Sequence, residues 1–262
     1  MNKVAVVTGG SSGIGRQTAK LLAEKGYTVF EFSRSGKAEG AVRHITADVT
    51  DESQVKAAFE QVFSETGRLD LLVNNAGMGI SGAVEFTELH EAKRIFDVNF
   101  FGVFLCVKES IKYLRETRNS QIINVSSVAA EFSIPYQSFY SATKSAQNSL
   151  TLALSGELCP FGIRVNALMP GDVSTGFTAA RSKSEAGTEV YGNAINSAVG
   201  VMEKDELGGM RPEKIAKAIF KVSQKKCTGR IFTVGGKYKV FVFISRFLPV
   251  GFVTKTVASM YR

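Results

Sequence analysis

Short apolar runs alternate with longer stretches of helical periodicity along most of this chain, and no other feature constrains the fold more tightly. The short runs predict strands at 4–7, 28–32, 43–46, 71–74, 121–125, 164–168 and 230–234, and the longer stretches predict helices at 14–25, 52–65, 88–114, 138–158 and 212–223. Nearly continuous apolar strands are typical of a parallel sheet, because crossover helices bury both of its faces. We therefore predict an α/β fold with a doubly wound parallel sheet.

The chain of 262 residues has the length of one domain, and its sequence contains no linker, internal repeat or low-complexity tract. Two segments depart from the strand–helix rhythm. Residues 172–210 are rich in Ser, Gly and Ala with weak periodicity, which predicts a lid loop over a substrate. Residues 237–262 follow the last predicted strand as an apolar, basic C-terminal extension. We expect a single domain, 1–262, that carries this lid and this extension.

The formal net charge of +8 is concentrated near the C-terminus. Glu213 is the last acidic residue, and eleven Lys and Arg residues follow it. Among these cations lies the aromatic-rich apolar segment 240–252, which is typical of an element that contacts a membrane surface peripherally. Alternatively, the segment covers the substrate opening or packs within or between subunits. Nucleic-acid binding is not expected, because charge is the only feature that would support it.

Cysteine and histidine are scarce, with three Cys and two His in the whole chain. The cysteines form no CxxC pair, and no cluster has the spacing of metal ligands, so we expect no metal site. The first residues are too short an apolar run for a signal peptide, and no run is long enough to span a bilayer. These features predict a cytoplasmic protein in a reducing compartment.

A glycine-rich turn, Thr8-Gly9-Gly10-Ser11-Ser12-Gly13-Ile14-Gly15, joins the first predicted strand to the first predicted helix. Glycines at this point let the backbone approach a pyrophosphate, and the helix N-terminus offers it free N–H groups. A tight turn without any ligand is the alternative, but the strand–turn–helix context disfavours it. The predicted dinucleotide-binding residues here are Gly9, Ser11, Ser12, Gly13, Ile14 and Gly15.

The end of the second strand indicates which dinucleotide is bound. NAD sites typically carry an acidic residue at the position that Ser33 occupies here, and Arg34 follows it. A guanidinium can bind the 2′-phosphate of NADP(H) with two hydrogen bonds, whereas a carboxylate would repel it. Glu31 shares a strand face with Ser33 and would favour NAD if it reached the ribose; Arg34 could also be a solvated loop residue. We predict NADP(H).

A Tyr140-x3-Lys144 pair carries the predicted chemistry. Residues four apart on a helix lie on one face, and an ammonium beside a phenol lowers the pKa of the phenol toward the working pH of an acid/base catalyst. This pair alone is common, and an ordinary core tyrosine beside a surface lysine would explain it. Ser126-Ser127, Asn74-Asn75-Ala76-Gly77 and Pro170-Gly171 each follow a predicted strand, however, so they should gather with the pair at one sheet edge.

Taken in order, the motifs TGGSSGIG, NNAG, VNFFG, Ser127…Tyr140-x3-Lys144 and PGDVST resemble those of the short-chain dehydrogenase/reductase family, in its branch of about 250 residues. The resemblance runs from about residue 3 to residue 234. It implies a single Rossmann-type domain. It also implies hydride transfer between C4 of a nicotinamide and a carbonyl or alcohol of the substrate.

The resemblance also implies residue roles. Tyr140 would give or take the substrate proton, and Lys144 would bind the nicotinamide ribose and lower the pKa of Tyr140. Ser127 would polarise the carbonyl; Ser126 is the competing serine, but the spacing of 13 residues to Tyr140 favours Ser127. Asn99 would hold a helix irregularity and a proton-relaying water. The further cofactor-binding residues it implies are Asp48 and Val49 at adenine, Asn75, Ala76 and Gly77 along the adenosine and ribose, and Pro170, Gly171, Val173 and Thr175 at the nicotinamide.

One of these assignments has an alternative, since Asp48 could instead be a turn residue. Asp172, inside the nicotinamide loop, has no assigned role. The candidate lid and pocket residues are mostly apolar and indicate a lipophilic substrate, steroid-like or an acyl-chain ketone, unless they merely pack on the body: Phe177, Tyr191, Val199, Val201, Met202, Met78, Ile80, Ser133 and Tyr136.

We thus predict an NADP(H)-dependent oxidoreductase that forms a homodimer or homotetramer. A non-catalytic NADP(H)-sensing Rossmann protein that acts through a binding partner is the alternative.

Overall fold

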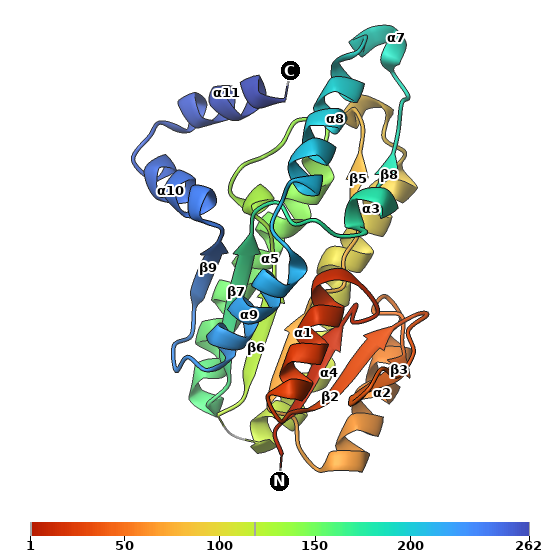
Figure 1. Cartoon of the computed structure of the whole chain (residues 1–262), viewed down its shortest axis with the longest axis vertical. Helices are drawn as coiled ribbons and strands as arrows, with labels where there is room; N and C mark the ends of the chain where they lie inside the picture. Colours follow the sequence, from red (N-terminus) through yellow and green to blue (C-terminus); the bar gives the residue numbers. More distant parts are fainter. Residues whose placement is uncertain (1, 118, 262) are drawn as a thin grey trace.

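The computed structural model describes residues 2–117 and 119–261, and its centre is a seven-stranded parallel sheet (Figure 1). The strand order is β3-β2-β1-β4-β6-β7-β9. The strands are β1 (Val4–Thr8), β2 (Thr28–Ser33), β3 (Val42–Thr46), β4 (Leu71–Asn74), β6 (Gln121–Val125), β7 (Arg164–Pro170) and β9 (Arg230–Val234). All neighbours in the sheet pair in parallel, and the order reverses beside β1. The predicted doubly wound α/β fold is confirmed.

Strand β1 shows how the apolar runs produce the layers. Val4 and Val6 belong to one buried cluster, and Ala5 and Val7 belong to a second cluster on the opposite face. The first cluster includes residues of α2 (Glu52–Thr66), α4 (Gly102–Thr117) and α5 (Ser138–Leu158), and the second includes residues of α1 (Gly13–Glu24) and α9 (Pro212–Ser223). Both faces of the sheet are therefore covered, as continuous apolar strands require.

The helix predicted at 88–114 is divided in the structure. It consists of α3 (Leu89–Phe96), a π-helical turn η2 (Asp97–Phe101) and α4, which continues to Thr117. In the π turn, the Asn99 amide is hydrogen-bonded to both backbone groups of Met78, at 2.8 and 2.9 Å. A π turn inserts an extra residue into the helix, which here aims the Asn99 side chain at the loop after β4.

The segment predicted as a lid loop, 172–210, is largely helical, so the prediction of a loop is wrong there. It holds α6 (Phe177–Ala180), α7 (Thr188–Tyr191) and α8 (Ala194–Leu207), and strand β8 (Ser182–Lys183) pairs with β5 (Ile80–Ser81). The first two helices are single turns, too short for periodicity to reveal. Three further short turns are η1 (Val84–Phe86), η3 (Val128–Ala130) and η4 (Cys159–Phe161).

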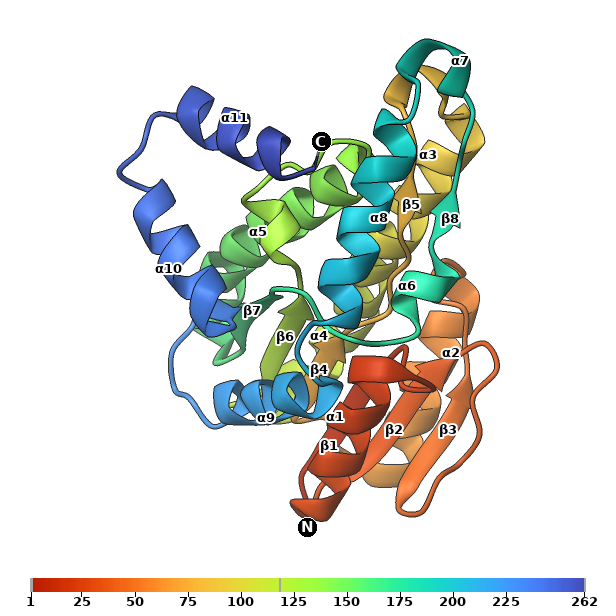
Figure 2. The same cartoon turned by 45° about the horizontal axis from the view of Figure 1, so that its top comes forward.

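The C-terminal extension forms α10 (Gly236–Ser245) and α11 (Val250–Met260) after the edge strand β9. Figures 1 and 2 show these two helices as a bent arm at the carboxyl ends of the strands, on the other side of that end from α7. Val242 and Val257 anchor the arm in a small buried cluster with Val128, Phe132 and Met169. Among the described residues, no helix has both the length and the apolar character to cross a membrane.

Candidate active site

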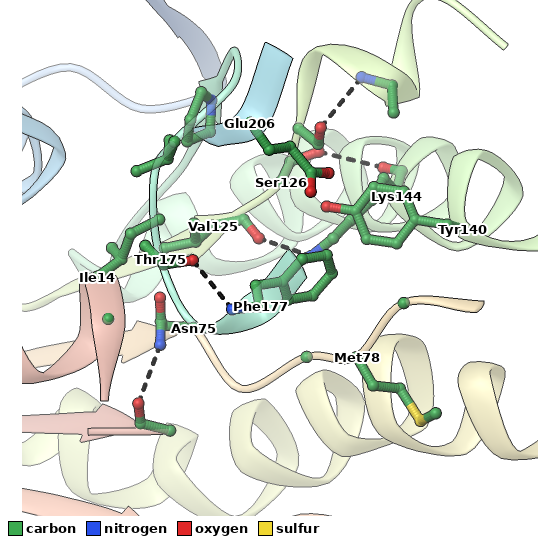
Figure 3. A pocket seen from close by; sticks show the side chains of 18 of the residues that line it. Ile14, Asn75, Met78, Val125, Ser126, Tyr140, Lys144, Thr175, Phe177 and Glu206 are labelled. Carbon is green, nitrogen blue, oxygen red and sulfur yellow. Dashed lines mark hydrogen bonds between the residues drawn. The ribbon is translucent and has the colours of Figure 1, made fainter. Parts of the chain in front are cut away.

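A cavity of about 580 Å³ opens at the carboxyl ends of the strands, and it collects nearly all the predicted site residues (Figure 3). Those that line it are Gly9, Ser11, Ser12, Gly13, Ile14, Ser33, Arg34, Asp48, Val49, Asn75, Ala76, Gly77, Ser127, Tyr140, Lys144, Pro170, Gly171, Val173 and Thr175. Gly15 and Asn99 do not line the cavity. The strand ends thus converge as their sequence positions predicted.

The glycine-rich turn has the backbone geometry of an anion cradle. Gly9 and Gly13 have φ angles of 65° and 51°, a region that other residues rarely adopt. A side chain on Gly15 would place its Cβ 2.2 Å from the carbonyl oxygen of Gly9, so Gly15 lets helix α1 pack against the turn. The first turn of α1 has no acidic residue, and its N-terminus at Ser12 and Gly13 faces the cavity. These residues fit the pyrophosphate of a dinucleotide.

At the end of β2, Arg34 and Glu31, which favoured different cofactors in the sequence, lie in different surroundings. Ser33 and Arg34 line the cavity together with Ser35, which the sequence reasoning missed. Glu31 does not line it: this carboxylate is 2% exposed, accepts a hydrogen bond from Ser33 at 3.2 Å and is paired with His44. The side chain that would have favoured NAD is therefore turned into the protein.

The position of Asp48 is compatible with both of its predicted roles, as a turn residue and as a contact for adenine. Its Oδ1 accepts hydrogen bonds from the backbone N–H and the hydroxyl of Thr50, at 2.9 and 2.8 Å, as a turn residue does. Asp48 also lines the cavity beside Val49, so its role at adenine stays a prediction that the turn does not oppose.

Tyr140 and Lys144 lie one turn apart on α5; Lys144 is buried, whereas Tyr140 is half-buried and lines the cavity. The Lys144 ammonium donates hydrogen bonds to the Val125 carbonyl at 2.9 Å and to Gln147 Oε1 at 3.2 Å. It lies 5.8 Å from the centre of the Tyr140 ring. Lys144 is thus held by a strand end and by its own helix, as Figure 3 shows for the contact with Val125.

The two neighbouring serines have different partners. Ser127 lies beside the Tyr140 side chain and lowers the pKa of that phenol, and its Oγ accepts a hydrogen bond from the N–H of Ala129 at 3.1 Å. Ser126 donates to the backbone carbonyl of Lys144 at 3.3 Å and so fastens β6 to α5. The arrangement favours Ser127 over Ser126 as the serine that faces a substrate together with Tyr140.

Burial controls the protonation of this pair. Burial raises the pKa of Tyr140 to about 12, although the hydrogen bond with Ser127 and the charge of Arg181 oppose the rise. Burial also lowers the pKa of Lys144 to about 8. The sequence predicts that Lys144 lowers the pKa of Tyr140, but desolvation of the phenol is the larger effect and raises that pKa. Tyr140 therefore stays protonated at neutral pH.

Asn99 lies outside the cavity and supports the residues around it through hydrogen bonds. Its side chain holds the loop at Met78 and also donates to Thr143 Oγ1 at 3.1 Å, while its backbone carbonyl accepts from Gln147 Nε2 at 3.0 Å. Gln147 therefore links Lys144 to the π turn. The sequence reasoning missed Gln147; a polar residue one turn after Lys144 on a predicted buried helix face is the signal that could have found it.

The nicotinamide loop is tied to the C-terminal helices. Asp172, which had no assigned role, accepts a hydrogen bond from the Tyr238 hydroxyl and lies 3.8 Å from the Lys237 ammonium. A Cβ on Gly171 would fall within the Tyr238 ring, 1.9 Å from its nearest atom. The glycine thus lets the ring of α10 lie directly on this loop.

The substrate side of the cavity differs from the sequence prediction. Phe177, Met202 and Met78 line it, whereas Tyr191, Val199, Val201, Ile80, Ser133 and Tyr136 do not. Tyr136, Tyr191 and Val199 instead pack in a separate cluster with Ala83 and Ile195, because the helices of the lid bury them. The remaining apolar wall is formed by Phe132 and Ile134 and, from α10 and α11, by Phe241, Val257, Met260 and Tyr261.

Glu206, on α8, lines the cavity together with its neighbour Asp205. Its carboxylate accepts from the Thr178 hydroxyl at 2.6 Å and pairs with the buried guanidinium of Arg181. Figure 3 shows Glu206 above Tyr140, and its charge raises the pKa of that phenol. Nothing in the weakly periodic lid sequence singled out this carboxylate.

Known proteins have sequences similar to this chain over most of its length. The family model for short chain dehydrogenases matches residues 3–186. A 3-ketodihydrosphingosine reductase of Bacteroides thetaiotaomicron is 41% identical over 227 residues, which cover 86% of this chain and 84% of the relative. A 3-oxoacyl-[acyl-carrier-protein] reductase, FabG, of Staphylococcus aureus is 38% identical over 195 residues, or 70% of this chain and 79% of the relative.

Solved structures agree with this relationship. A short-chain dehydrogenase from Streptomyces avermitilis superposes with a TM-score of 0.83 at 31% identity, covering 94% of this chain and 92% of that one. ElxO, solved with NADP bound, gives 0.75 at 27% identity and covers 92% and 100%. A 3-ketoacyl-(acyl-carrier-protein) reductase from Brucella melitensis, complexed with NADH, gives 0.73 at 31% identity and covers 88% and 96%. This chain therefore belongs to the short-chain dehydrogenase/reductase family of oxidoreductases.

Proposed function

We propose that this protein is an NADP(H)-dependent oxidoreductase that reduces the ketone of a long-chain lipophilic substrate. The observation that carries the proposal is the meeting of a glycine-rich anion cradle with Ser127, Tyr140 and Lys144 in one cavity at the sheet edge. When bound there, NADPH supplies the hydride that adds to the carbonyl carbon.

Within this proposal, Ser127 and Tyr140 donate hydrogen bonds to the carbonyl oxygen. Tyr140 then gives up its proton as charge develops on that oxygen, so the product is the alcohol. A phenol with a pKa of about 12 is fully protonated before the reaction, which suits the reductive direction. Lys144 holds the nicotinamide ribose, and Asn99, through the π turn, positions a water that returns the proton from solvent.

The preference for NADP(H) is supported by charge. Arg34, with the hydroxyls of Ser33 and Ser35 beside it, offers a cationic rim for a 2′-phosphate, whereas Glu31 is occupied inside the protein. ElxO binds NADP and the Brucella reductase was solved with NADH, so the family relationship alone does not select the cofactor. The local charge at the end of β2 is what supports NADP(H) here.

The substrate class is supported by the relatives and by the cavity wall. The 3-ketodihydrosphingosine reductase and the 3-oxoacyl reductase are named for ketones on long or growing acyl chains. Phe132, Phe241, Val257 and Met260 give this cavity an apolar wall beyond Tyr140 that suits such a chain. A 3-ketodihydrosphingosine-like ketone is therefore the substrate we favour over a steroid-like one.

The remaining assignments stay proposals. Exposed Phe101, Phe104 and Leu152, on and beside α4 and α5, support a homodimer or homotetramer. All three cysteines are free, which supports a cytoplasmic setting. The NADP(H)-sensing alternative is disfavoured, because a sensor needs the glycine-rich turn but has no use for a serine and a tyrosine placed together in the cavity.

The test is steady-state oxidation of NADPH and of NADH with 3-ketodihydrosphingosine, a β-keto acyl thioester, a steroid ketone and a short water-soluble ketone. We expect turnover of a long-chain ketone with NADPH and weaker turnover with NADH. Tight binding of NADPH without turnover of any ketone would instead identify a sensor, and binding of neither cofactor would refute both functions.

A further inference from the structure

The outer side of the C-terminal helices is the largest concentration of exposed apolar side chains in the described chain. We call this the arm surface; it comprises Val240, Phe243, Ile244, Phe247, Leu248, Val250 and Phe252. Phe247 is 74% exposed and Val250 is 80% exposed. Isolated exposed apolar residues are normal, but a contiguous group on two short helices marks an interaction surface.

The arm is apolar on its inner side as well. Val242 and Val257 are buried in the cluster with Phe132, and Phe241 packs edge-on against Phe132 at 6.0 Å. The fold therefore accounts for the inner apolar residues and leaves the outer ones uncovered. A helix that is apolar all round is stable only when both of its sides are covered.

The charged residues of the two arm helices and the turn between them all have one sign. Lys239, Arg246 and Lys255 are exposed, and none of them forms a salt bridge with any residue that the structure describes. No acidic residue follows Glu213 in the sequence. An apolar centre with an unpaired cationic rim is complementary to an anionic, apolar partner.

We propose that the arm surface docks this protein on an anionic phospholipid bilayer. Helices α10 and α11 have 10 and 11 residues, so they are suited to lie in the interface, since a spanning helix needs about 20. A symmetric pair of copies joined through this surface would bring the same cations face to face, which disfavours a second copy as the occupant. A lipid surface with anionic headgroups satisfies both the apolar centre and the rim.

The arm also connects this surface to the cavity. Phe241, Val257 and Met260 line the cavity that contains Tyr140, while their neighbours on the same two helices form the arm surface. A long-chain ketone can therefore pass from the bilayer to Tyr140 along an apolar route at the carboxyl ends of the strands. This second step rests on the proposed function; the docking itself does not.

The docking is tested by sedimentation of the full chain with vesicles of phosphatidylcholine alone and of phosphatidylcholine mixed with phosphatidylglycerol in equal parts. We expect binding to the mixed vesicles, much weaker binding to the neutral ones, and weakening at high salt. The triple variant K239Q/R246Q/K255Q should bind the mixed vesicles on the order of a hundredfold more weakly, at about fivefold for each cation. Binding that is insensitive to both lipid charge and these substitutions would overturn the proposal.

The apolar contribution is tested by F243S/F247S, which removes two exposed rings. We expect at least about a tenfold loss of vesicle binding. The matched control is F161S, an exposed phenylalanine at the amino end of β7, and it should bind as the parent does. NADPH binding and turnover of a water-soluble ketone should be unchanged in all three variants. Failure of the parent to sediment with mixed vesicles would overturn the docking. Dissociation of an oligomer by F243S/F247S would show that the arm surface is a protein interface instead.

Supply of substrate is tested with the long-chain ketone incorporated in mixed vesicles. F243S/F247S should turn it over at least about tenfold more slowly than F161S does, while both turn over a water-soluble ketone equally. Equal rates on the embedded ketone would overturn the proposed route. A parent that binds vesicles but reduces no ketone would refute the proposed function and leave the docking standing.

Discussion

The nucleotide-binding half of the sheet and the C-terminal part, residues 172–261, build their shares of the cavity in different ways. In the first half, backbone groups set the shape of the cavity. The N–H groups of Asn75 and Ala76 donate to the Thr8 hydroxyl, each at 3.0 Å, and Gly9 has a positive φ. In the C-terminal part, side chains on short helices set the shape of the cavity, through contacts such as the hydrogen bond from Tyr238 to Asp172. The glycine-rich end of the cavity is therefore shaped mainly by backbone conformation, whereas the C-terminal wall is shaped by side chains.

The largest expected effect lies at the boundary of the two parts. Tyr140→Phe should lower kcat for ketone reduction on the order of a thousandfold, because the proton donor is removed. The dissociation constant for NADPH should stay close to that of the parent. Tyr191→Phe is the matched control, since it removes a hydroxyl of the lid that bonds Glu85 at 3.1 Å outside the cavity. Loss of activity in both variants to a similar degree would show that lid order, rather than proton donation, limits the rate.

The next effect concerns the nucleotide-binding half alone. Arg34→Asp should raise the KM for NADPH by about 10- to 100-fold and leave or improve the KM for NADH, because a charged contact to the 2′-phosphate becomes a repulsion. Arg16→Ser is the control: Arg16 is an exposed arginine on α1 whose partner is Glu39. An unchanged cofactor preference in Arg34→Asp would mean that another group reads the phosphate.

The pH dependence should separate the roles of Tyr140 and Lys144. Folding raises the pKa of Tyr140 from 10 to about 12, so the proton donor is retained and kcat for reduction should stay level from neutral pH to well above pH 8. Folding lowers the pKa of Lys144 from 10.5 to about 8, so the ammonium is lost above that pH and the KM for NADPH should climb. Steady-state profiles of kcat and KM provide the measurement. A fall of kcat with a midpoint near pH 8 would place the titrating proton donor elsewhere.

The same shifts make a statement about stability. Below about pH 8 the buried Lys144 ammonium costs stability, and this cost is relieved as the pH rises from about 8 to 10.5. The neutral Tyr140 contributes stability that is lost as the pH rises from 10 through about 12. Thermal unfolding of Lys144→Met across this range should show the first trend abolished.

The smallest expected effect is at the contact between loop and arm. Tyr238→Phe removes the hydrogen bond to Asp172 and should raise the KM for a long-chain ketone a few-fold, with faster backbone hydrogen exchange in α10. Tyr27→Phe, which loses a bond with Gln224 at 3.3 Å on the surface, is the control. Unchanged exchange in α10 would show that the cluster around Val242 alone holds the arm.

The sequence was sufficient for the nucleotide-binding half because its requirements are local. Gly9, Gly13 and the apolar strands are dictated by backbone conformation and by burial within a few residues, and these leave a direct pattern. The choice between Glu31 and Arg34 was not local, since it depended on His44 of the neighbouring strand drawing Glu31 inward.

The C-terminal part could not be predicted to the same depth. Tyr136 and Tyr191 do not line the cavity, because their rings pack against each other with centres 6.0 Å apart. This contact joins segments more than fifty residues apart in the sequence. Glu206 is brought to the site by its tertiary contact with Arg181, and Gln147, outside this part, is fixed by its contact with the Asn99 carbonyl on the π turn. Only the composition of the extension, apolar and basic, indicated that it would have a role beyond completing the sheet.

Transfer of deuterium provides the sharpest test of the proposed chemistry. The full chain is incubated with NADPH that carries deuterium at both C4 positions of the nicotinamide and with 3-ketodihydrosphingosine in mixed vesicles, and the alcohol is analysed by mass spectrometry. We predict one deuterium on the carbinol carbon of the product, formed with the parent and with Tyr191→Phe but on the order of a thousandfold more slowly with Tyr140→Phe. Alcohol without deuterium at that carbon, or equal rates in the two variants, would contradict it.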